Sequence, residues 1–360
     1  MLHGHNACSQ SSAKLLPLKR RSRINVLFTS TGRRVELLRA FRQAYSVLGL
    51  DGILVAVDVD PLAAALQIAD RAYIVPPVGS EDYVPTLTAI CRREEIDLVV
   101  PLIDPDVSVL ALARPILEAT GARVAVVSPA ATEVTADKWR TQEFFQSLGL
   151  TTPRSWLPEQ LRETDIVYPL FIKPRGGSAG KDGFRVDNRR DLEFFLEYVP
   201  RPIVQQCIDG PEITSDVLCD LEGTLLGVVS RRRIEVRSGE VAKGVTVHRQ
   251  AVIDACVRIA DKLPAVGAIT VQCLMHGEVP CFTEINARMG GGVPLGIAAG
   301  FDVPLLLLSR CAGIAVDIPP LGAYQTDVHI TRFDDSFFLT AQQREQFAAS
   351  RIDTHGVPPA

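Results

Sequence analysis

Short apolar runs that alternate with amphipathic stretches constrain the N-terminal part of this chain most strongly. Segments with helical periodicity, such as residues 33–49, separate β-branched runs at 24–30, 53–59, 72–77, 97–104 and 123–129. Strands that are apolar along their whole length are typical of parallel sheets, because helices cover both faces of such a sheet. The pattern therefore predicts a Rossmann-like α/β domain over residues 24–130.

The pattern changes near residue 130. A helical stretch at 135–149 precedes a glycine-rich segment at 176–183, and residues 213–233 form a strand-like run with an "EG" turn that suits a hairpin. These features are typical of antiparallel α+β structure, with boundaries near 130 and 204. The predicted units are a disordered extension at 1–23, the α/β domain at 24–130, α+β units at 131–204 and 205–330, and a C-terminal tail at 331–360.

Composition excludes several classes of protein. The 360 residues are 47% hydrophobic with a net charge of -4, so nothing indicates binding to nucleic acid. Charged residues interrupt the longest apolar stretches, which are too short to span a bilayer. The first 23 residues lack the apolar run of a secretory signal, and the eight cysteines show no CxxC or metal spacing. These observations favour a soluble cytoplasmic protein with reduced thiols.

The first predicted strand and turn do not favour an oxidoreductase. A dinucleotide-binding turn needs three glycines at fixed spacing, and only Gly32 is present. Arg33 and Arg34 follow at a helix start, where they either hold a substrate anion or are simply solvated. Asp104 and Asp106 end a later strand, and they either contact substrate or cap the next helix.

A lysine at a strand end, followed by a glycine-rich loop, indicates a polyphosphate site. The apolar run before Lys173 opens into a loop that contains Gly176, Gly177, Gly180 and Gly183. Glycines allow successive N–H groups to face anionic oxygens, while Lys173 supplies a fixed positive charge. An ordinary flexible hairpin explains the loop equally well when it is considered alone.

The next extended segment suits a purine nucleoside. Gln205, Gln206 and Ile208 lie on a predicted strand whose backbone can pair with adenine, and Glu212 follows at a spacing that suits the ribose hydroxyls. The competing interpretation is an edge strand with a solvated glutamate.

Residues 267–286 predict a hairpin that carries oxygen ligands. Glu284 and Asn286 lie on one face of the second strand because side chains alternate, and the hairpin brings Gln272 close to both. Oxygen donors without Cys or His suit a hard cation such as Mg²⁺, held jointly with nucleotide phosphates. Arg288 can then reach the transferred phosphoryl group, and the glycines at 290–292 let the chain turn near it. A polar sheet face without metal is the competing interpretation.

The order of these features resembles the ATP-grasp superfamily. Lys138, Lys173, the glycine loop, "QQCIDGPE", Gln272 and "EINAR" carry the resemblance, which covers about residues 24 to 312. It is most similar to the branch that contains the carbamoyl phosphate synthetase large subunit and the pyrrolysine-biosynthesis ligase. The resemblance implies a Rossmann-like pre-ATP-grasp domain followed by a two-lobed ATP-grasp fold. With one such module and no glutaminase-like segment, a single-module ligase is expected.

The resemblance also implies roles for individual residues. Lys138 and Lys173 are expected to contact the α and β phosphates of ATP, and the loop that includes Gly176, Gly177, Ser178, Ala179 and Gly180 is expected to close over the triphosphate. The strand at Gln205, Gln206 and Ile208 would meet adenine, Glu212 would hold ribose, and Gln272, Glu284 and Asn286 would bind one or two Mg²⁺ or Mn²⁺ ions. Two departures from the family pattern are glutamines where many relatives carry acids: Gln205 and Gln206 in the adenine strand, and Gln272 among the metal ligands.

The implied reaction joins a small-molecule carboxylate to an amine through an acyl phosphate, with release of ADP and phosphate. Arg288 and Lys173 are the catalytic candidates, while Arg33, Arg233 and Lys243 are candidates for binding substrate. A homodimer is compatible with the sequence. Two alternatives remain open: an enzyme that phosphorylates bicarbonate, as carbamoyl phosphate synthetases do, and a catalytically silent ATP-binding regulatory protein.

Overall fold

The computed structural model describes residues 21–177, 182–237 and 239–349. Most of the predicted N-terminal extension and loop residues Ser178, Ala179 and Gly180 therefore lie outside the described residues. Within the described residues no helix is both long and apolar enough to cross a membrane. The seven cysteines in this part of the chain are unpaired, and most are buried.

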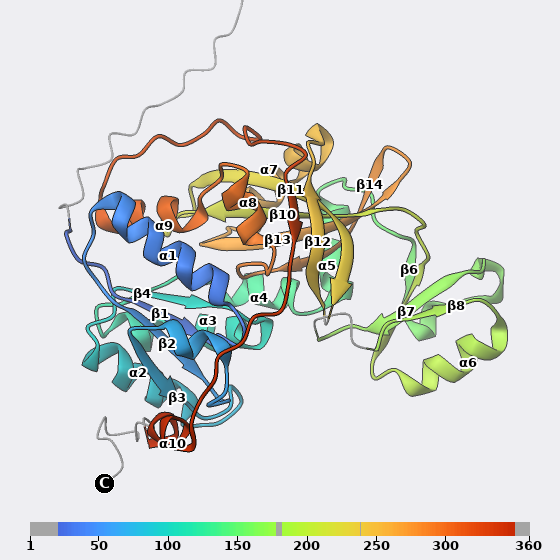
Figure 1. The fold of residues 1–360 in the computed structure, drawn as a ribbon. Coiled ribbons are helices and arrows are strands. Elements are labelled where there is room, and N and C mark those ends of the chain that lie inside the picture. The colour runs from blue at the N-terminus through green and yellow to red at the C-terminus, as the bar shows by residue number, and fades with distance from the viewer. Residues whose placement is uncertain (1–20, 178–181, 238, 350–360) are drawn as a thin grey trace, which may run out of the picture.

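The first domain is a five-stranded parallel sheet with the order β3-β2-β1-β4-β5. Its central strands are buried along their whole length because helices cover both faces, as the sequence predicts. One face packs against α1 and the later helix α9, and the other packs against α2 and α3 (Figure 1). The elements are β1 (Val26–Thr29), α1 (Val35–Leu48), β2 (Leu54–Asp58), η1 (Ala64–Ile68), β3 (Arg71–Ile74), α2 (Tyr83–Arg93), β4 (Leu98–Pro101), α3 (Asp104–Glu118) and β5 (Arg123–Val124).

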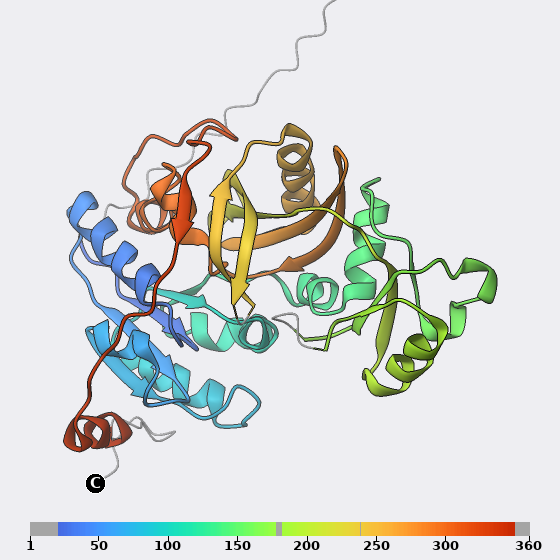
Figure 2. The ribbon, with the colours of Figure 1, turned by 45° about the vertical axis from the view of Figure 1, so that its right-hand side comes forward.

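Two helices lead from this domain into a small four-stranded antiparallel sheet with the order β6-β9-β7-β8. Together with α6 it has a core of its own, built around Leu170, Ile172 and Val204, and it stands to one side of the rest of the molecule (Figure 2). The boundary predicted near 204 falls inside β9. The elements are α4 (Pro129–Thr135), α5 (Lys138–Ser147), β6 (Ser155–Trp156), η2 (Pro158–Gln160), η3 (Glu163–Asp165), β7 (Leu170–Pro174), β8 (Phe184–Val186), α6 (Arg189–Tyr198) and β9 (Pro202–Gln206).

The largest sheet is antiparallel with the order β14-β13-β10-β11-β12-β15, and it contains both predicted hairpins. Helix α7 packs on one face, and α8 and α9 pack on the other. Apolar residues of this sheet join the two cores of the first domain, so the two units are packed as one body. The elements are β10 (Glu212–Cys219), β11 (Leu225–Arg237), β12 (Glu240–Thr246), α7 (Gln250–Lys262), β13 (Ala268–His276), β14 (Val279–Asn286), α8 (Val293–Ala298) and α9 (Val303–Ala312).

The chain then crosses back over the molecule. Strand β15 (His329–Thr331) adds an edge to the large sheet by pairing with β12. Helix α10 (Ala341–Ala349) lies beside β3 of the first domain (Figure 1). The segment that the sequence presents as a tail is thus in contact with both the large sheet and the first domain.

Candidate active site

A cleft of about 820 Å³ lies between the two antiparallel sheets and reaches the end of the first domain's sheet. Among its described lining residues seven side chains are basic and four are acidic, which suits an anionic ligand: Arg34, Lys138, Lys173, Arg185, Arg231, Arg233 and Arg288 against Asp104, Glu212, Glu240 and Glu284.

Most of the residues that the sequence singles out meet in this cleft. Its lining includes Lys138, Lys173, Gly176, Gly177, Gln205, Gln206, Ile208, Glu212, Arg233, Gln272, Glu284, Asn286 and Arg288. The lining does not include Arg33 and Lys243. The Arg33 side chain is 57% exposed and contacts Glu240, whereas Lys243 pairs with Glu235 at 2.7 Å on the surface of β12.

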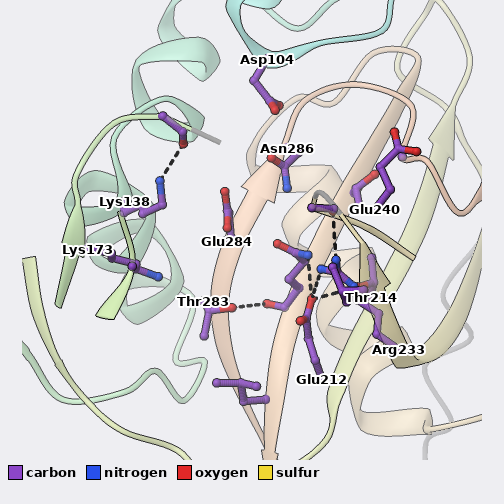
Figure 3. A pocket seen from close by; sticks show the side chains of 18 of the residues that line it. Asp104, Lys138, Lys173, Glu212, Thr214, Arg233, Glu240, Thr283, Glu284 and Asn286 are labelled. Atoms are coloured by element: carbon purple, nitrogen blue, oxygen red, sulfur yellow. Dashed lines mark hydrogen bonds and ion pairs between the residues drawn. The ribbon is translucent and has the colours of Figure 1, made fainter. Parts of the chain in front are cut away.

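The two lysines lie on the side of the cleft opposite Glu284 and Asn286, Lys173 on the small sheet and Lys138 on α5 (Figure 3). Lys173 lies near the end of β7, and burial lowers its pKa to about 8; Glu284 across the cleft opposes this change, while Lys138 adds to it. Lys138 starts α5, and its Nζ donates to the carbonyl of Gly177 at 2.8 Å. A phosphate group placed between these ammonium groups would gain two positive partners.

Asp137 fixes the base of the glycine loop. Its carboxylate caps α5 by accepting from the N–H of Trp139, and it also accepts hydrogen bonds from Arg175, from Nε to each oxygen at 3.1 Å and from Nη2 at 2.6 Å. Burial alone would raise the pKa of Asp137, but the hydrogen bonds from Arg175 and the backbone lower it. The loop therefore leaves β7 from a charged anchor, which sets the position of Gly176 and Gly177.

The strand expected to meet adenine lines the cleft at its small-sheet side. Gln205 is buried, and its amide nitrogen donates to Ser155 Oγ at 2.8 Å, so this side chain is held within the small lobe. Gln206 is exposed, and its backbone N–H donates to the carbonyl of Arg154 at 2.7 Å. The side chain of Gln205 therefore stabilises the small lobe.

Glu212 is the centre of a polar network on the large sheet. Its Oε1 accepts from Gln272 Nε2 and from Arg233 Nη1, each at 2.8 Å, and from Thr214 Oγ1 at 3.3 Å (Figure 3). The interaction with Arg233 directs that arginine to a protein carboxylate. Because Gln272 uses its amide nitrogen here, its Oε1 remains available to a cation.

The β13–β14 hairpin places the predicted metal ligands. Gln272 pairs with Glu284, and Thr270 pairs with Asn286, so the three oxygen-bearing side chains lie together at the cleft wall. Within the described part of the chain no group of three His, Cys, Asp or Glu side chains could hold a metal. One carboxylate and two amides fit a hard cation such as Mg²⁺ when the oxygens of a bound phosphate complete the coordination.

Arg288 connects this wall to the first domain. Its Nη2 donates to Asp104 Oδ2 at 2.8 Å and to Asn286 Oδ1 at 3.5 Å, and its side chain is 15% exposed. Asp104 thus belongs to the cleft. Asp106 does not, because it is fully buried and accepts hydrogen bonds from Thr29 at 2.6 Å and Tyr83 at 3.0 Å.

The glycine run Gly290–Gly292 makes space for arginine side chains. A Cβ on Gly292 would lie 2.1 Å from Arg231 Nε, and one on Gly291 would lie 2.5 Å from Arg34 Nη1. The need for glycine here is therefore close approach, since neither residue has a positive φ.

Three further arginines, which the sequence does not single out as the main candidates, lie in or next to the site. Arg231 belongs to the same basic run as Arg233 and points to the same side of β11, as strand alternation predicts. Arg34 lines the cleft while its neighbour Arg33 does not, and nothing in the local sequence distinguishes the two. Arg332 follows β15 and donates to the carbonyl of Gly291 at 2.6 Å and to Glu36 at 2.7 Å, a contact that depends on how the chain returns.

Comparison with known proteins agrees with this architecture. Residues 26–125 match the model of the PylC-like N-terminal domain, and residues 135–292 match that of the ATP-grasp domain. The arginine-specific carbamoyl phosphate synthase large chain of Bacillus subtilis is 23% identical over 73% of this chain and 26% of its own length. A carbamoyl-phosphate synthase of Methanobrevibacter smithii is 29% identical over 47% of this chain and 46% of its own. The chain thus spans less than half the length of these curated relatives.

Solved structures share the fold at low sequence identity. A biotin carboxylase from Campylobacter jejuni superimposes with a TM-score of 0.67 and 19% identity, over 85% of this chain and 74% of the other. An L-amino acid ligase from Bacillus licheniformis superimposes with a TM-score of 0.63 and 21% identity, over 82% of this chain and 75% of the other. These findings confirm the predicted Rossmann-like domain and two-lobed fold. The chain thus contains an ATP-grasp domain at residues 135–292, which follows a PylC-like N-terminal domain at residues 26–125.

Proposed function

We propose that this protein is an ATP-dependent ligase that phosphorylates a carboxylate and joins the resulting acyl phosphate to an amine. The observation that carries this proposal is the arrangement of charge across one cleft. Lys173 lies on β7 of the small sheet and Lys138 at the start of α5, while Glu284 and Asn286 lie opposite them on β14 of the large sheet (Figure 3), with Arg288 just after that strand. Phosphoryl transfer needs positioning and charge neutralisation more than a protein nucleophile, and this is what such a site supplies.

The proposed reaction gives each group of side chains in the cleft one role. Lys138 and Lys173 hold the triphosphate, and a substrate carboxylate oxygen attacks the γ-phosphorus while the bond from that phosphorus to the bridging oxygen of ADP breaks. Arg288 stabilises the charge on the phosphoryl group during transfer. An amine then attacks the acyl carbon, phosphate leaves, and the amine loses its proton. Mg²⁺ held by Gln272, Glu284 and Asn286 would neutralise phosphate charge.

ADP and phosphate, never AMP and pyrophosphate, should appear when the purified protein meets its carboxylate substrate, because the proposed reaction breaks the bond between the γ-phosphorus and ADP. Hydroxylamine should trap the acyl phosphate as a hydroxamate when no amine is present. A panel of carboxylates that includes bicarbonate, read by phosphate release, tests this. AMP as product would indicate an adenylating enzyme, ADP release with bicarbonate alone would indicate carboxyphosphate chemistry, and ATP binding with no product from any carboxylate would indicate a regulatory protein.

Nucleotide affinity should depend on pH through Lys173. Its pKa of about 8 in the free protein means that the ammonium form is lost as pH rises through 8, whereas a bound phosphate raises the pKa by favouring that form. The apparent Kd for a non-hydrolysable MgATP analogue should therefore increase between pH 7 and pH 9.5, by up to about ten-fold per pH unit above 8. Calorimetry measures this.

The matched control is Lys173→Arg, which keeps its charge at all these pH values. Its Kd should stay nearly constant over the range. If the affinity of both proteins changes in parallel with pH, Lys173 does not carry the linked proton.

A further inference from the structure

Two nearly buried arginines line the end of the cleft next to the first domain. Arg34 comes from the start of α1 and Arg231 from β11, and their side chains are 13% and 5% exposed. Both pack against the same short turn, Gly290–Gly292, and both line the cleft. We call this part of the cleft, formed by Arg34, Arg231, Glu240 and Gly290–Gly292, the interdomain end.

Positive charge is not fully matched at the interdomain end. Glu240 is shared by three guanidinium groups: Arg34 at 3.1 Å, Arg33 at 3.3 Å and Arg332 at 3.5 Å. Each of the two neighbouring carboxylates already has an arginine partner, since Asp104 pairs with Arg288 and Asp216 pairs with Arg231. Glu36 is half exposed, and of the arginines named here it pairs only with Arg332.

Two further observations show that the pairing of these arginines is incomplete. Arg231 is 4% exposed as a whole, and its buried Nε has no hydrogen-bond partner within the described part of the protein. Burial lowers the pKa of Arg34, Glu240 opposes this, and Arg288, Arg332 and Arg33 add to the lowering by repulsion. An oxyanion would supply the partner that Arg231 Nε lacks and would add negative charge beside Arg34, which shares its one carboxylate.

We propose that the interdomain end binds a second carboxylate of the substrate, one that is not phosphorylated, so that the substrate is a dicarboxylate or an acidic amino acid. The reacting carboxylate must lie beside Arg288, Glu284 and Asn286, where the phosphoryl group is transferred. Arg34 and Arg231 lie next to Arg288 on the side of the first domain, and a planar guanidinium matches a carboxylate in two parallel hydrogen bonds. This proposal rests on the proposed ligase function and specifies its substrate class.

Binding of matched ligand pairs tests the proposal. In calorimetry with a non-hydrolysable MgATP analogue present, α,ω-dicarboxylates from malonate to adipate, with aspartate and glutamate, are compared with analogues that carry a methyl group in place of the second carboxylate. At least one dicarboxylate should bind the wild-type protein about ten-fold or more tightly than its partner, as expected for a hydrogen-bonded charge. Arg34→Gln should abolish that difference.

Arg33→Gln is the matched control, because Arg33 is the adjacent residue, contacts the same Glu240 and lies outside the cleft lining. It should keep the preference for the dicarboxylate. Binding of the MgATP analogue to both variants shows that they are folded. Arg34→Lys should restore part of the preference for the dicarboxylate, because it keeps a positive charge at the position that contacts the ligand.

Three results would overturn the proposal. The first is that no dicarboxylate or acidic amino acid binds better than its methyl analogue, and the second is that Arg33→Gln and Arg34→Gln lose the preference equally. The third is tighter binding of carboxylates that carry a phosphonate in place of the second carboxylate, which would assign the interdomain end to phosphate groups. Selective dicarboxylate binding without any ADP release would contradict the proposed ligase reaction while leaving this substrate class intact.

Discussion

Glu284→Gln should reduce the rate of ADP formation by about a hundred-fold to a thousand-fold while the protein still binds nucleotide. Glu284 is the one carboxylate among the three proposed metal ligands, and it is also the charge that faces Lys173 across the cleft. Glutamine keeps the shape of the side chain but removes its negative charge. The variant should also need a higher Mg²⁺ concentration for half of its maximal rate, because a neutral oxygen holds the cation less tightly.

The control for this change is Glu278→Gln. Glu278 lies at the exposed turn of the same β13–β14 hairpin, so the substitution changes the same charge on the same element outside the cleft. Its activity and Mg²⁺ dependence should match those of the wild-type protein. Unchanged turnover and an unchanged Mg²⁺ requirement in Glu284→Gln would remove this residue from the proposed metal site.

Arg288→Ala should lower kcat by about a thousand-fold, the magnitude typical of an arginine that stabilises a transferring phosphoryl group. Arg288 is 15% exposed, lines the cleft and is oriented by Asp104 from the first domain. Arg288→Lys should restore little activity, because an ammonium group cannot bond to Asp104 and to the phosphoryl group with the same planar geometry. Single-turnover measurements of ADP formation separate this effect from changes in nucleotide binding.

Asp104→Asn should have a smaller effect on the same step, since it weakens the orientation of Arg288 and leaves its charge in place. Arg237→Ala serves as a control, because Arg237 is 58% exposed at the end of β11 and lies outside the cleft lining. Full activity of Arg288→Ala would contradict the role proposed for Arg288. A larger loss of kcat in Asp104→Asn than in Arg288→Ala would show that Asp104 does not act only by orienting Arg288.

The sequence alone predicts the elements whose information is local. Parallel strands appear as uninterrupted apolar runs because both of their faces are buried, and β1, β2 and β4 are buried along their length. The alternation of side chains along β14 is sufficient to place Glu284 and Asn286 on one face. The position of Lys173 near the end of β7 is also local information, because an apolar run that is followed by a lysine and glycines marks the end of a strand.

Tertiary structure alone decides the contacts between distant segments. Arg33 and Arg34 are adjacent and chemically identical, yet only Arg34 lines the cleft, because neighbouring residues at a helix start point in different directions and the sequence does not say which faces the large sheet. Lys243 lies outside the cleft lining because β12 presents it to the surface, where it pairs with Glu235. Arg332 reaches Gly291 only because β15 returns to pair with β12. Local periodicity thus determined the strands, the hairpins and the polar face of β14, while the packing of segments far apart in the chain determined which arginines meet at the interdomain end.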